Sequence, residues 1–218
     1  QQERMGSRAN YARLDGAVER NDALTEREAA FIEARDGFYQ ATVSETGWPY
    51  VQFRGGPSGF LKVLDARTIG YADFRGNVQY ISVGNLGGDD RVSIILMDYA
   101  NQARLKLLGR ARLVDAADDP ELIERLRMPG YRAQIERAVV ITVEGYDWNC
   151  PQHITPKFTE AQITLATAPL WRQLEQAQAA LAKARADVGG EAPPTELGNG
   201  PLALTIAGVR QLTPRIRA

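Results

Sequence analysis

The sequence predicts a mainly β fold with peripheral helices, in which six antiparallel strands form a barrel or a sandwich. Six runs rich in β-branched and aromatic residues, or alternating in polarity, lie between residues 38 and 114. Their connections are short, and the chain lacks the strand–helix–strand rhythm of a parallel sheet. The two longest helical patterns lie outside these strands, at residues 1–35 and 159–187.

The amino-terminal segment predicts helix, and the strands follow it directly. Thr25 and Glu28 have the spacing of a capping box, and the helix is expected to end before Gly37. Between the fourth and fifth strands, Val78–Leu86 predicts a short helix or a loop. The six expected strands are Phe38–Ser44, Pro49–Arg54, Phe60–Leu64, Thr68–Ala72, Arg91–Tyr99 and Arg104–Val114.

The carboxyl-terminal half alternates between helix, strand and irregular loop. A helix is expected over Asp118–Arg127, and a late strand over Ala138–Val143. Two prolines between residues 147 and 156 predict an irregular loop. The helix over Thr159–Asp187 carries apolar residues at spacings of four and three, a coiled-coil-like seam of about two heptads. This seam consists of Leu170, Leu174, Ala177, Leu181 and Ala184.

Composition and pattern divide the chain into five segments. They are an amino-terminal helical segment (1–36), a barrel domain (37–158), a long helix (159–187), a Gly- and Pro-rich linker (188–201) and the start of a second domain (202–218). In the last segment, Leu202–Val209 alternates like the first strand of a new sheet, and no pairing strand follows it. The chain also begins with Gln1, so we expect a piece of a longer polypeptide.

The composition is that of a globular domain. The 218 residues are 44% hydrophobic and 24% charged, and the formal net charge is −1. That balance argues against a nucleic-acid partner or a membrane surface. No apolar run approaches the ~20 residues of a membrane span, and no signal-peptide pattern opens the chain. The single cysteine excludes an internal disulfide, and a cytoplasmic location fits best.

A glycine-rich loop before the third strand is the first candidate binding site. Glycine exposes backbone amides, and a fixed cation nearby suits a phosphorylated anion. The alternative is that the glycines only let a barrel corner turn. Lys62, a lone cation in the following apolar strand, would either hold an anion at the barrel rim or lie in solvent. The loop residues concerned are Arg54, Gly55, Gly56, Pro57 and Ser58.

Polar residues after the fourth strand form the second candidate site. Asp73 and Asn77 would hydrogen-bond a polyol or a ring edge, or would form an ordinary surface turn. Tyr80, Ser82 and Asn85 follow at helical spacing. The first turn of such a helix would offer free amides to a phosphate, and the alternative is an exposed helix face.

Arg104 and the pair Cys150 and His153 are two further candidates for chemical roles. Arg104 heads the sixth strand, where its guanidinium would stabilise negative charge on a bound ring or simply lie in solvent. Cys150 and His153 have Cys-x-x-His spacing, but the chain holds one cysteine and one histidine in all. A metal site needs three or four ligands, and a thiol nucleophile needs a base and an orienting group. We therefore expect a structural loop or a pocket wall there, no metal site, and no identified catalytic residue.

Five stretches of the chain form a specific combination. They are FRGGPSGFLKVLD, IGYADFRGNVQYISVGNL, DDRVSIILMDY, RLKLLGRARLV and DWNCPQHITPKF. Together they resemble the pyridoxamine 5'-phosphate oxidase-like flavoproteins, and within them the branch called FMN-binding, pyridoxamine 5'-phosphate oxidase-related proteins. The resemblance runs from about Ala29 to Phe158. It implies an FMN-binding split barrel and a homodimer with two flavins at the dimer interface.

The resemblance also implies site residues. The family's phosphate-and-ring strand matches Pro57–Lys62, the end of its next strand matches Tyr71-Ala72-Asp73, and its following helix matches Asn77–Asn85. The family glutamine that reaches the flavin from the partner chain falls on Arg104, and Arg54 is expected to replace the family's strand-start arginine. The family's Ser-Arg-Lys run and its substrate-holding tryptophan and arginine have no clear counterpart. True pyridoxamine phosphate oxidase activity is therefore not expected.

The expected function follows from these matches. It is an FMN-dependent oxidoreductase that passes hydride or electrons to a small-molecule substrate, with NADH or NADPH as the default donor. One alternative is an electron-relay or binding module that holds FMN, haem or a deazaflavin, and another is a structural dimerisation domain without a cofactor. The tail Leu202–Ala218 resembles the opening strand of a ferredoxin-reductase-type flavin domain, which implies fusion to a reductase and an iron–sulfur domain.

Overall fold

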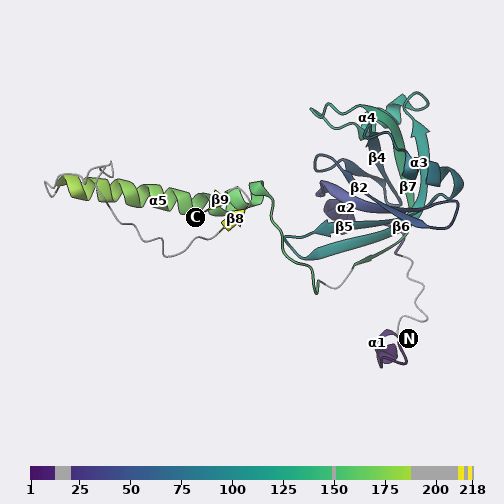
Figure 1. Cartoon of the computed structure of the whole chain (residues 1–218), viewed down its shortest axis with the longest axis horizontal. Coiled ribbons are helices and arrows are strands. Elements are labelled where there is room, and N and C mark those ends of the chain that lie inside the picture. Colours follow the sequence, from purple (N-terminus) through teal and green to yellow (C-terminus); the bar gives the residue numbers. More distant parts are fainter. Residues whose placement is uncertain (13–20, 149–150, 188–210, 214–215, 218) are drawn as a thin grey trace. The chain divides into compact units, whose positions relative to one another are not determined.

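The computed structural model describes residues 1–12, 21–148, 151–187, 211–213 and 216–217 (Figure 1). The chain divides into two units, residues 1–158 and residues 159–218, and each is described by itself. The expected linker and the alternating stretch after it lie outside the described residues. No helix in the described ranges is long and apolar enough to cross a membrane.

The first unit consists of short helices and a large sheet. Its helices are α1 (Arg8–Tyr11), α2 (Glu26–Glu33), α3 (Ile81–Gly88) and α4 (Pro120–Leu126). Its strands are β1 (Gly37–Val43), β2 (Pro49–Gly55), β3 (Leu61–Asp65), β4 (Thr68–Phe74), β5 (Arg91–Asp98), β6 (Ala103–Asp115) and β7 (Ile135–Trp148). The second unit contains α5 (Glu160–Asp187), β8 (Gln211–Thr213) and β9 (Ile216–Arg217).

The strands of the first unit join one antiparallel sheet in the order β2-β1-β5-β6-β7-β4-β3. The predicted β-rich fold with peripheral helices and a long carboxyl-terminal helix is thus confirmed, but the predicted count of six strands is one too low. The extra strand is the expected late strand Ala138–Val143, which extends over 14 residues as β7 and lies between β6 and β4. The sheet remains split, because β2 and β3 end the order and do not pair with each other.

The amino-terminal segment is helical only in part, since residues 21–25 before α2 are not helical. The predicted capping box is present: Glu28 accepts hydrogen bonds from the hydroxyl and the amide of Thr25, the latter at 3.1 Å. Trp148 Nε1 donates to Glu28 at 2.7 Å, which ties α2 to the end of β7. Burial acts to raise the pKa of Glu28, but these hydrogen bonds outweigh it and lower that pKa.

Apolar side chains pack on both faces of the curved sheet. Inside, the rings of Phe38 and Phe60 stack with centroids 5.6 Å apart, and both meet Tyr71 edge-on. Ile32 of α2 is fully buried against this inner core. On the outer side, α4 buries three of its seven residues against β4 and β7. The two clusters hold β4 and β7 from both sides, so the residues that follow β4 start from a fixed position.

The strands β6 and β7 approach each other closely at one glycine. Their register shifts between Leu108 and Gly109, which marks a bulge. A Cβ atom at Gly109 would overlap the carbonyl oxygen of Thr142 and press on the side chain of Ile141. The close approach therefore requires glycine at this position.

We expect Gly109→Ala to lower the free energy of unfolding by about 1–3 kcal/mol, because the backbone of β7 would have to move. Gly145→Ala is the matched control, since Gly145 lies at the same bulge and an added Cβ there would meet nothing within 4 Å. Urea denaturation of both variants measures the effect. Equal unfolding midpoints for the two variants would contradict the prediction.

Candidate functional site

Side chains, not backbone groups, join β1 and β2 to the opposite side of the barrel. Gln40 and Thr42 on β1, and Gln52 and Arg54 on β2, project to the inside by strand alternation. Their partners come from β4 and α3. We call these four hydrogen bonds the polar seam: Tyr71 to Gln40 (2.9 Å), Asn85 to Thr42 (3.0 Å), Ser82 to Gln52 (2.9 Å) and Arg54 to Asp73 (2.9 Å).

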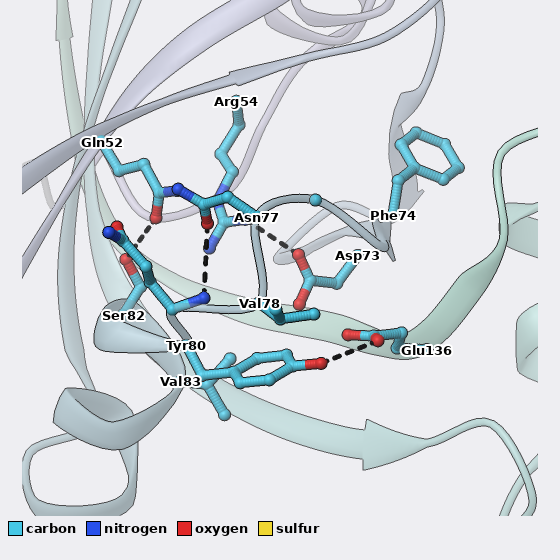
Figure 2. Close-up of a pocket in the computed structure, with 12 residues that line it drawn as sticks. Gln52, Arg54, Asp73, Phe74, Asn77, Val78, Tyr80, Ser82, Val83 and Glu136 are labelled. Carbon is cyan, nitrogen blue, oxygen red and sulfur yellow. Dashed lines mark hydrogen bonds and ion pairs between the residues drawn. The ribbon is translucent and has the colours of Figure 1, made fainter.

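Two hollows adjoin at the polar seam. The seam hollow (Figure 2) has a cavity volume of about 50 Å³ and the aromatic hollow one of about 240 Å³. Both are lined by Gln52, Arg54, Asp73, Phe74 and Gly76. The seam hollow also includes Asn77, Val78, Tyr80, Ser82, Val83 and Glu136. The aromatic hollow also includes Phe53, Gly55, Tyr71, Ala72, Arg75 and Tyr131.

Asp73 is the centre of a charge network in the wall between the hollows. Its nearly buried carboxylate lies 2.9 Å from Arg54 and 3.2 Å from Arg137. Glu136 lies 3.6 Å from Arg137 and 3.8 Å from Arg75. Arg137 also lies 3.9 Å from Asp115, so three guanidinium groups face three carboxylates and the formal charges of the network balance. Burial raises the pKa of Asp73, and the charges of Arg54 and Arg137 offset only part of this.

The start of α3 opens into the seam hollow without a cap. Tyr80 is the residue before the helix, and no side chain caps the free amides of the first turn. Val78 and Tyr80 both have left-handed backbone, with φ of 55° and 52°. Left-handed backbone is strained for residues with bulky side chains, and residues strained in this way are found mainly at functional sites. The Tyr80 hydroxyl donates to Glu136 at 2.9 Å (Figure 2), and this hydrogen bond raises the pKa of Tyr80.

The hollows collect some of the predicted site residues and not others. Seven of them line one hollow or both: Arg54, Gly55, Ala72, Asp73, Asn77, Tyr80 and Ser82. Six line neither: Gly56, Pro57, Ser58, Lys62, Asn85 and Arg104. Asn85 belongs to the polar seam, and Gly56 packs against the ring of Phe60, which a Cβ would overlap. Contact of any of these residues with a ligand stays a prediction.

Gln52, Glu136 and Arg137 are among the lining or network residues that the sequence did not predict. Gln52 could have been found, because strand alternation places it on the same face as Arg54. Glu136 and Arg137 gave no such signal. Arg137 reaches Asp73 only because the antiparallel register of β4 and β7 sets these two residues opposite each other. Sequence spacing does not contain that register.

The Cys-x-x-His stretch is described only after Cys150, which lies outside the described residues. His153 has a left-handed φ of 64°, and the carbonyl of Ile154 accepts a hydrogen bond from Gln102 Nε2 at 2.7 Å. This contact holds the loop against the hairpin between β5 and β6. Within the described part of the chain, no group of three or more His, Cys, Asp or Glu side chains could hold a metal ion.

Known proteins resemble the chain over its β-rich part. A family model described as Pyridoxamine 5'-phosphate oxidase matches residues 24–148. The conserved hypothetical protein Rv2991 from Mycobacterium tuberculosis is similar in structure, with 19% identity, a TM-score of 0.45, and coverage of 66% of this chain and 96% of that one. HupZ from Group A Streptococcus is also similar, with 16% identity, a TM-score of 0.44, and coverage of 62% of this chain and 99% of that one. General Stress Protein 26 from Bacillus anthracis str. Sterne has 13% identity, a TM-score of 0.43, and coverage of 60% of this chain and 92% of that one. No curated protein matches the sequence.

The raised pKa of Asp73 makes a prediction about pH. A carboxyl group with a raised folded-state pKa contributes most stability below its unfolded pKa of about 4, and this contribution is lost as the pH rises through the folded-state pKa. The variant Asp73→Asn has no carboxyl group at this position, so it does not lose this stability as the pH rises. Its stability relative to the parent chain should therefore rise as the pH increases from about 4 through the folded-state pKa of Asp73, by roughly 1.4 kcal/mol for each pH unit between the unfolded and folded pKa values.

Urea denaturation at a series of pH values measures this difference. Asp118→Asn, at an exposed position before α4, is the control for loss of one acidic group. A relative stability of Asp73→Asn that stays flat or falls as the pH rises would contradict the assignment.

Proposed function

Because the chain belongs to the pyridoxamine 5'-phosphate oxidase family, we propose that it is an FMN-dependent oxidoreductase that passes hydride or electrons to a small-molecule acceptor. One observation carries the proposal: a hollow suited to a phosphate and a hollow suited to a planar ring share a wall at Arg54 and Asp73. FMN has one part of each kind. The two parts of the cofactor would lie on either side of that wall.

The seam hollow fits the phosphate of FMN. A phosphate monoester carries about −1.5 to −2 charges near neutral pH, and Arg54 supplies a guanidinium group to the lining of the hollow. The uncapped start of α3 adds backbone donors and the positive end of the helix dipole. Arg54 Nε is buried and has no hydrogen-bond partner among the described residues, so one donor is unsatisfied beside the hollow.

The aromatic hollow fits a planar ring. The rings of Phe74 and Tyr131 meet edge-on at this hollow, with centroids 5.0 Å apart. Aromatic faces of this kind stack against a flat ligand. When bound, FMN supplies the hydride and single-electron chemistry. The residues of this chain would bind the ring, orient it and limit its exposure to water.

The outer face of β2, β1, β5 and β6 supports a homodimer with the flavin at its interface. The register sets Phe53 opposite Tyr39, and Tyr39 opposite Ile95, and Leu108 lies on the same face with 58% exposure. An apolar face of this extent marks an interaction surface. Arg104 also lies on this face, and its buried Nε has no partner among the described residues. A second copy covering the face would bring its own Arg104 toward the first copy's ring.

We expect the purified protein to bind FMN and Arg54→Gln to weaken the Kd by about 10- to 100-fold, because a hydrogen bond to a charged group contributes about 1.5–3 kcal/mol. Quenching of flavin fluorescence measures both constants. Arg67→Gln is the control, since Arg67 pairs with Asp22 at the surface and lines neither hollow. Failure of the parent chain to bind FMN, or equal weakening in the two variants, would overturn the assignment.

Turnover separates the proposed enzyme from an electron relay. The FMN-loaded chain is mixed with NADH or NADPH and a small quinone or nitro compound, and the consumption of the nicotinamide is followed. Steady turnover supports the oxidoreductase. Bound FMN that exchanges electrons with neither donor nor acceptor would identify a module without its own substrate.

Mixing two inactive variants locates the site relative to the dimer. If each site takes Arg54 from one copy and Arg104 from the other, the variants Arg54→Gln and Arg104→Ala each remove one of these two side chains from every site. Mixed dimers would then contain one intact site, and random exchange should restore tight FMN binding to roughly a quarter of all sites. No recovery after exchange would show that both arginines serve the same copy.

A further inference from the structure

The helix α5 exposes an apolar stripe along its whole length. It has 28 residues, a length of about 42 Å, and no buried side chain. Leu170, Leu174 and Leu181 are 63%, 46% and 52% exposed. An amphipathic helix gains most of its stability by packing its apolar face against a partner. In the described residues, α5 has no such partner.

The heptad pattern of the stripe begins one heptad before Leu170. Ile163 and Thr167 continue the alternating spacing of four and three before Leu170, which makes three heptads instead of two. Leu165, which is 78% exposed, lies on the opposite face. The complete seam consists of Ile163, Thr167, Leu170, Leu174, Ala177, Leu181 and Ala184.

We propose that α5 pairs in antiparallel orientation with the α5 of a second copy of the chain. When Ile163 lies opposite the partner's Leu181, the same register sets Leu170 opposite the partner's Leu174. Thr167 then lies opposite the partner's Ala177. Six of the seven seam residues thus lie opposite a seam residue of the partner, and Ala184 lies opposite the partner's Glu160. The inference stands on α5 alone and is independent of the proposed function.

Charge complementarity favours the antiparallel arrangement over the parallel one. In the antiparallel register, Glu160 lies beside the partner's Lys183 and the partner's Arg185, and two-fold symmetry repeats this contact at the other end. A parallel pair would instead place Glu160, which continues the seam spacing before Ile163, opposite its own copy. Like charges at equivalent positions repel, whereas opposite charges stabilise helix pairs.

Disulfide trapping in the full chain tests both the pairing and its direction. The variants Ile163→Cys and Leu181→Cys are made in a Cys150→Ser background, mixed and treated with a mild oxidant. We expect a disulfide that joins the two different variants, at least tenfold more abundant than in a control mixture of Leu165→Cys with Leu181→Cys. Mass spectrometry identifies the linked peptides.

The outcomes decide the inference. Addition of Leu174→Glu to both variants should abolish the cross-link, whereas addition of Leu165→Glu should leave it unchanged. Cross-linking of each variant only to itself would indicate a parallel pair and overturn the proposal. A yield no higher than that of the control mixture would show that α5 does not pair with itself.

Discussion

The barrel depends on the polar seam that spans its split. Backbone pairing continues around the sheet from β2 to β3 and then stops, so nothing in the ladder fixes how the two sides meet. Apolar packing alone tolerates several relative positions. The seam removes that freedom, because Tyr71, Ser82 and Asp73 each have one partner across the split. Any other position would leave buried polar groups unpaired, at a cost of about 1–3 kcal/mol each.

The sequence predicted local features better than long-range ones. Strand alternation, the capping box at Thr25 and the short helix after β4 depend on neighbouring residues, and each was recognised. The length of β7 was missed, because the residues on either side of Ala138–Val143 are charged or polar and become strand only through pairing with β6 and β4. The partnership of Arg137 with Asp73 was missed for the same reason, since these residues are 64 positions apart and meet only through the register of β4 and β7.

Arg54 connects the stability of the barrel with the proposed ligand site. One side of its guanidinium holds Asp73 across the seam, while Nε remains buried without a partner among the described residues. A cation fully neutralised by carboxylates would attract no phosphate, and a fully unpaired one would be costly to bury. Arg54 lies between these two extremes, because it is paired with Asp73 and still has one unpaired donor. The same side chain would hold the fold together and leave a donor for an anion.

The position of β2 has a consequence for motion. This strand pairs with β1 alone, so β2 could move away from β4 without breaking any backbone pair between them, while β1 remains paired with β5. Only side-chain contacts resist this local opening. Backbone amide hydrogens that face the gap between β2 and β4 would exchange with solvent when the barrel opens. A molecule bridging the gap would slow the exchange. Ligand binding in the hollows and local opening of the barrel would then be coupled, because a bound ligand would stabilise the closed barrel.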